Sequence, residues 1–106
     1  MANPWTGEVA LVIDGQRRVM KLTLGALAEL EQALESQSLV DLVERFEAGR
    51  FSSRDVLALV VAGLRGGGGD VAPSDLLRAE IDGGPVAAAR AAAELLARAF
   101  MVPGEA

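Results

Sequence analysis

Residues 7–22 read GEVALVIDGQRRVMKL, and this stretch decides the fold because it predicts a β-hairpin. Asp14 and Gly15 stand between two apolar-rich segments. Asp-Gly is typical of a two-residue type I′ turn, in which both central residues take a positive φ. Such a turn fixes the register, and the predicted cross-strand pairs are Ile13–Gln16, Leu11–Arg18, Val9–Met20 and Glu8–Lys21. One face of this hairpin is apolar, so it must pack on other elements, because an isolated hairpin is marginally stable in water.

A helix is predicted to begin directly after the hairpin. Thr23 stands at its N-cap position, with Leu22 and Leu27 at the two positions of a hydrophobic staple. The predicted apolar stripe of this helix is Leu24, Leu27, Leu30 and Leu34. The hairpin therefore leads straight into an element that can cover its apolar face.

Two further helix starts carry the pattern of a capping box. Ser38 is followed three residues later by Asp41, and Ser52 is followed in the same way by Asp55. The second of these helices, at about residues 54–65, is apolar almost all round, which predicts a central position in the fold.

Four glycines at 66–69 are predicted to end the central helix, because glycine is a poor helix former. The stretch lacks the Gly-Lys-Ser/Thr ending of a phosphate loop, so we interpret it as a flexible joint between helices. A short helix within 72–84 and a long one over 85–100 follow. The side chains expected to face inward from the long helix are Val86, Ala89, Ala93, Leu96 and Phe100.

Together these signals predict an α+β fold that is mainly α, with an N-terminal β-hairpin packed on a bundle of four to five helices. We expect residues 1–106 to form a single domain, because this length is typical of one. Its expected parts are the hairpin at 7–22, the helical bundle at 23–100 and a tail at 101–106.

The composition argues against several classes of function. With no histidine and no cysteine, the chain lacks the residues of His- or Cys-dependent catalysis and of His or thiolate metal sites, so we expect no enzyme, no catalytic residue, no metal and no cofactor. The net charge of −5 disfavours nucleic acid as a partner. The N-terminus has no signal-peptide pattern, and no apolar run reaches the roughly 20 residues of a membrane span, which favours a cytoplasmic protein.

Three residues near the hairpin are candidates for partner binding. Trp5 precedes the hairpin, and tryptophan is enriched at interface hot spots, although such a residue also often packs over the end of a core. Arg17 and Arg18 follow the turn and suit an acidic partner, but arginines at an edge strand also protect against aggregation.

Three segments of the chain resemble a family of small tail proteins from gene transfer agents, which are phage-like particles. The matching stretches are GEVALVIDGQRRVMKLTLGALAELEQAL (7–34), SLVDLVERFEAGRFSSRDVLALVVAGLRGGG (38–68) and AAAELLARAF (91–100). The family is described as either a tail tube protein or a tail assembly chaperone. The resemblance implies a tape-measure protein and a tail tube subunit as partners, and it brings no catalytic or ligand residues.

The predicted elements bear on the choice between these two roles. A tube lined by β-sheet needs several long strands, whereas this chain offers two short ones and about five helices. We therefore expect first a chaperone that binds the tape-measure protein. The alternative is a structural tail tube or tail-completion subunit, in which copies of the chain would associate. A small DNA-binding regulator is the third alternative, disfavoured because Arg54 is the only residue near the start of its candidate recognition helix suited to reading bases.

Overall fold

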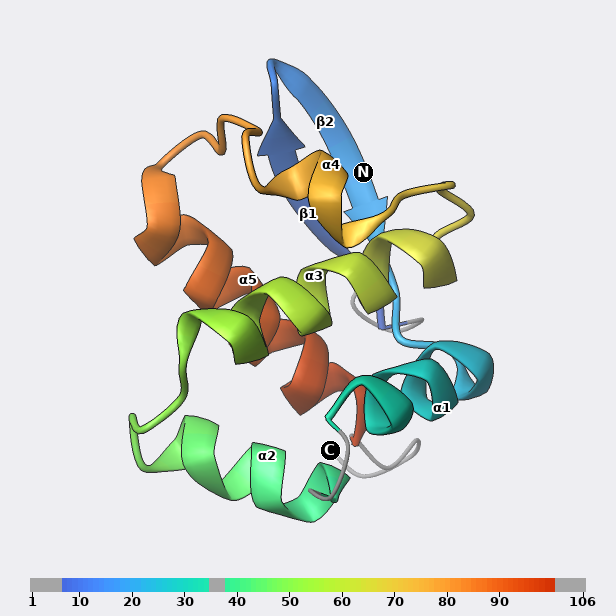
Figure 1. The fold of residues 1–106 in the computed structure, drawn as a ribbon, viewed down its shortest axis with the longest axis vertical. Coiled ribbons are helices and arrows are strands. Elements are labelled where there is room, and N and C mark those ends of the chain that lie inside the picture. Colours follow the sequence, from blue (N-terminus) through green and yellow to red (C-terminus); the bar gives the residue numbers. More distant parts are fainter. Residues whose placement is uncertain (1–6, 35–37, 101–106) are drawn as a thin grey trace.

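The structure, a computed structural model, describes residues 7–34 and 38–100 (Figure 1). Within these ranges the elements are β1 (Val9–Ile13), β2 (Gln16–Met20), α1 (Leu24–Ala33), α2 (Leu39–Glu47), α3 (Ser53–Gly66), α4 (Pro73–Leu76) and α5 (Gly84–Ala99). Figure 1 shows α3 crossing the middle of the molecule, with the hairpin near one end and α2 near the other. The predicted class, α+β and mainly α, is confirmed.

The hairpin has the predicted register. Val9 pairs with Met20, Leu11 with Arg18 and Ile13 with Gln16 in an antiparallel ladder. Both turn residues take the positive φ that a type I′ turn needs, 51° at Asp14 and 78° at Gly15. The predicted Glu8–Lys21 pair lies just beyond the ends of the two strands. The side chains of Val9, Leu11, Ile13 and Met20 are buried, so the apolar face of the hairpin is part of the core.

The outer edge of β1 is occupied near the turn by a segment from the other half of the chain. The Asp14 amide donates to the Glu80 carbonyl at 2.7 Å, and the Asp82 amide donates to the Val12 carbonyl at 3.0 Å. At the residue before β1, Arg98 Nη1 donates to the carbonyl of Glu8. The chain itself therefore contacts part of this edge, at Val12 and at both ends of the strand.

The outer edge of β2 lies against the end of α3, and glycine is required there. The Lys21 amide donates to the Gly63 carbonyl at 2.9 Å. A Cβ added to Gly66 would lie 1.9 Å from the Lys21 carbonyl oxygen, and one added to Gly67 would lie 2.2 Å from that of Val19. The glycines do end the helix as predicted. The interpretation as a flexible joint is wrong for Gly66 and Gly67, because the neighbouring backbone lies too close to leave room for a side chain at either position.

The predicted helix starts are confirmed by their hydrogen bonds. Thr23 Oγ1 accepts from the Ala26 amide at 3.1 Å. Ser38 and Ser52 both form complete capping boxes with the aspartate three residues further on. The central position of α3 is confirmed as well: the buried residues of this helix are Asp55, Leu59, Val60, Val61, Ala62, Gly63 and Leu64.

The prediction of which side chains of the last helix face inward is largely wrong. In α5 the buried residues are Ala88, Ala91, Ala92, Leu95 and Leu96. Val86 is 67% exposed and Phe100 is 50% exposed, so the buried face is rotated from the predicted one. Leu24 was also assigned to an apolar stripe, but at the first position of α1 it is 84% exposed.

Candidate protein-interaction surface

Among residues 7–34 and 38–100, no three acidic side chains gather in a way that would hold a metal ion. None of the described helices combines the length and apolar character that crossing a membrane requires. The features that stand out are a polar network, an apolar groove and an uneven distribution of charge.

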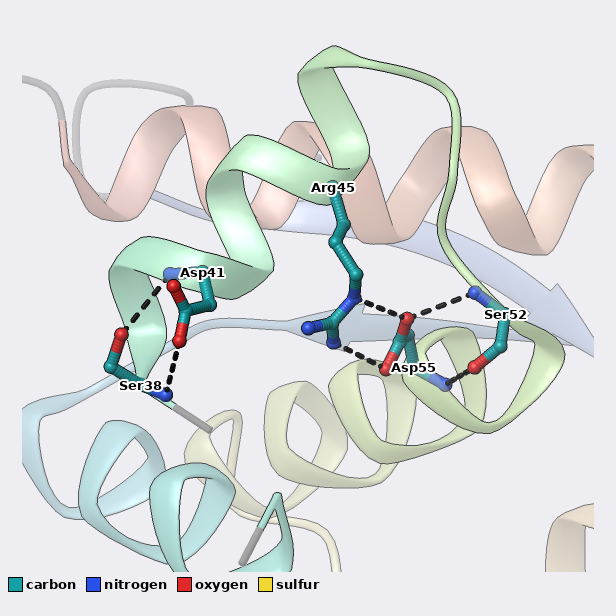
Figure 2. A network of polar contacts seen from close by, with 5 residues as sticks. All are labelled: Ser38, Asp41, Arg45, Ser52 and Asp55. Atoms are coloured by element: carbon teal, nitrogen blue, oxygen red, sulfur yellow. Dashed lines mark hydrogen bonds and ion pairs between the residues drawn. The ribbon is translucent and has the colours of Figure 1, made fainter. Parts of the chain in front are cut away.

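The polar network joins α2 to the start of α3 (Figure 2). Arg45 donates from Nε and Nη2 to both carboxylate oxygens of Asp55, at 3.2 and 2.8 Å. The same carboxylate accepts from the Ser52 amide at 2.9 Å, and the Asp55 amide donates to Ser52 Oγ at 3.2 Å. One aspartate thus caps α3 and anchors α2, as the shared oxygen in Figure 2 shows.

This environment lowers the pKa of Asp55. Burial acts in the opposite direction and raises it, because it disfavours the charged form. The hydrogen bonds from Arg45 and from the Ser52 amide, together with the positive charge of Arg45, outweigh burial and bring the pKa below its ordinary value. The carboxylate is therefore charged at neutral pH, as a fork-shaped guanidinium partner requires.

An aromatic contact supports the same junction. The rings of Phe46, on α2, and Phe51, before α3, are stacked with centroids 4.4 Å apart and planes 6° from parallel. With Leu42 fully buried, α2 is attached through its inner face, and the other face is left to solvent.

An apolar groove of about 640 Å³ lies between the first half of α3, the α4 region and the start of α5. Its lining includes Val56, Val60, Leu76 and Ile81, which belong to elements distant in the sequence. Leu77 lines it as well and is 71% exposed. Exposed apolar surface of this kind marks sites of protein or ligand contact.

The net negative charge of the protein is concentrated in a segment that does not line this groove. Residues 24–47 hold six acidic residues and one basic residue, a net charge of −5 that equals the net charge of the whole chain. The remaining residues are therefore neutral in sum. In the groove, Arg54 is the one charged residue among those that form the lining.

The sequence-predicted partner-binding residues lie elsewhere. Trp5 is outside the described residues. Arg17 is exposed on β2 and borders a smaller hollow of about 280 Å³ beside β1 and α5. Arg18 is half-buried, and its guanidinium lies near Gly69. The two arginines are not part of the apolar groove.

Sequence reasoning missed the groove and the two residues that distinguish it. Arg54 was considered only as a residue that could read DNA bases, and Leu77 was not singled out. The available signal was the Leu-Leu pair at 76–77, which stands at the end of a four-residue helix too short to bury both side chains.

These features define a small helical protein whose prominent surfaces suit contacts with other proteins. The chain matches the family described as "Phage tail tube protein, GTA-gp10" over residues 6–102. The protein belongs to this family, and it is a tail protein of the gene transfer agent and phage type. Comparison with curated proteins gave no match, and comparison with solved structures gave none either.

Proposed function

We propose that this protein is a structural subunit of the tail tube in a phage-like particle. The match of nearly the whole chain to a tail tube family carries the proposal. It favours what the sequence had suggested as the alternative, a tube or tail-completion subunit, over a chaperone for the tape-measure protein. In this role the chain acts through protein contacts with other tail subunits, without catalysis, and assembles in the cytoplasm before particles are released.

The exposed groove and the acidic surface support a role in assembly. A protein that works as a monomer has little use for a groove with so much apolar lining. Such apolar surfaces are usually covered by a partner in the functional state. A net charge of −5 keeps the free subunit soluble until it is incorporated.

One observation favours the chaperone as a second candidate. In residues 7–34 and 38–100 the sheet has two strands, and segments of the same chain lie against part of each outer edge. A tube wall made of β-sheet grows by adding strands at such edges, so this fold would have to rearrange to join one. A chaperone that covers the tape-measure protein needs no such rearrangement.

A single experiment separates the two functions. The tagged chain is expressed in particle-producing cells, and its copy number is measured by mass spectrometry in purified particles and in cell extract. A tube subunit is present at many copies per particle, in fixed ratio to the other tail proteins. A chaperone is missing from finished particles and is recovered from the extract together with the tape-measure protein; that result would overturn the tube proposal.

A further inference from the structure

The apolar groove is open to solvent and has one charged residue at its rim. Leu77 and the first residues of α5 line it, and beside them Val86 is 67% exposed. Arg54 is exposed at the opposite wall, at the second position of α3. In the described parts of the chain, its guanidinium makes no ion pair. The positive charge of Arg54 favours an occupant with carboxylates.

A face with the complementary character is present on the same protein. On α2, Val40 is 66% exposed, and Glu44 and Glu47 follow it at helical spacing and are also exposed. The one basic residue of this helix, Arg45, does not compete, because it faces inward and is held by Asp55. The outer face of α2 therefore presents an aliphatic side chain followed by two carboxylates.

We propose that copies of this protein associate head to tail, with the outer face of α2 of one copy lying in the apolar groove of the next. Val40 then packs near Leu77, and Glu44 and Glu47 lie toward Arg54. The inner face of α2 is fixed to α3 in its own molecule, so the contact forms between molecules. This inference goes beyond the proposed function, because it names the surfaces through which copies meet and holds for either tail role.

The two surfaces differ, so the contact is heterologous. Contacts of this type repeat from copy to copy and produce closed rings or open filaments, depending on the rotation between neighbours. Fifteen residues line the groove, fewer than the roughly 20–30 per side of a standard stable interface. We therefore expect weak association, with monomers in dilute solution and larger species as the concentration rises.

Sedimentation velocity over a concentration series, from about 10 µM to about 1 mM, tests the proposal. Wild-type protein is expected to shift to larger species within this range. Arg54→Glu places like charges together and is expected to weaken association by at least about tenfold. Leu77→Ser removes the apolar contact and is expected to act in the same direction. Both residues are exposed, so the fold tolerates these changes. Arg90→Glu is the matched control, since it makes the same change of charge at an exposed position of α5 outside the groove lining.

A mixing experiment tests the pairing of the two surfaces. Glu44→Arg alone is expected to weaken association, but a mixture of Arg54→Glu and Glu44→Arg copies restores opposite charges and should form larger species than either alone. Wild-type protein that stays monomeric throughout the range would overturn the proposal. So would an Arg54→Glu variant that associates like the wild type, or a mixture without recovery. These results are independent of the copy number measured in particles. If the proposed contact is absent, the choice between tube subunit and chaperone is still decided by that measurement.

Discussion

The two ends of α3 are joined to their neighbours by different physical means. At its C-terminal end, Gly66 and Gly67 lie so close to β2 that a single added carbon would overlap a carbonyl oxygen. At its N-terminal end, charge and hydrogen bonding hold α2 through Asp55 and Arg45. The first junction depends on the absence of side chains, and the second depends on two particular side chains. The first should therefore respond to volume alone, and the second to charge and pH.

The largest effect is expected from Gly66→Ala. The new Cβ would overlap the Lys21 carbonyl, which belongs to the backbone and can yield only if the strand and helix separate. We expect the free energy of unfolding to fall by about 3 kcal/mol or more, measured by urea denaturation. Gly25→Ala is the control: this site in α1 has no neighbour nearer than 3.9 Å, and alanine should stabilise the helix by about 0.5–1 kcal/mol. Equal effects at both sites would contradict the steric explanation.

Asp55→Ala tests the polar junction. It removes the cap of α3 and leaves Arg45, whose side chain is 22% exposed, without its partner. We expect a loss of about 2–3 kcal/mol in urea unfolding, below the usual cost of breaking a fully buried pair because water reaches this one. Asp41→Ala provides a matched control. It removes the carboxylate at the corresponding position of the α2 capping box, which is exposed and whose hydrogen bond is to the Ser38 amide. Its expected cost is about 0.5–1 kcal/mol.

The same junction should weaken in acid. Because the pKa of Asp55 is lower in the folded protein than in the unfolded chain, its contribution to stability is complete above about pH 4, the ordinary range for aspartate. It is lost as the pH falls through the lowered pKa of the folded state. Urea unfolding of wild type and Asp55→Asn between about pH 2 and 6 should give curves that converge in acid. A constant difference between them would exclude this linkage.

The smallest effect is expected from the aromatic stack. Phe51→Leu keeps an apolar side chain but removes the ring that lies 4.4 Å from that of Phe46. We expect about 1 kcal/mol of destabilisation by thermal or urea unfolding, the usual value of such a pair. In an Asp55→Ala background the loss should change, because both contacts hold α2 to α3 and neighbouring contacts are seldom additive. Strict additivity would show that the two contacts act independently.

The features that the sequence predicted best are those that depend on interactions between residues close together in the chain. The hairpin register follows from Asp14 and Gly15, and the helix starts follow from serine and threonine caps, since each needs only neighbours in the chain. The buried face of α5 could not be found in this way. Alanines of α5 lie on nearly every side of the helix, so several of its faces are equally apolar. Which face is buried depends on how α5 packs against α3 and the hairpin.

Contacts between distant residues explain the other differences. Asp55 was recognised as a cap, but its arginine lies ten residues away on another helix, and no local pattern indicates the pairing. Gly66 and Gly67 were recognised as glycines that end a helix, and their contact with β2 exists only once the chain has folded. The groove is likewise the product of three elements that no single stretch of sequence contains.

The contacts at the edges of the hairpin also bear on the order in which the protein forms. The strands leave the ribosome before the helices, yet the groups that contact their edges are supplied by Gly63, by residues 80–82 and by Arg98. The Arg98–Glu8 contact joins residues 90 positions apart, and contacts of such long range slow folding. The hairpin is therefore synthesised before the helices but completed only after they have formed. Until nearly the whole chain has emerged, its apolar face and open edges are exposed to whatever binds nascent polypeptides.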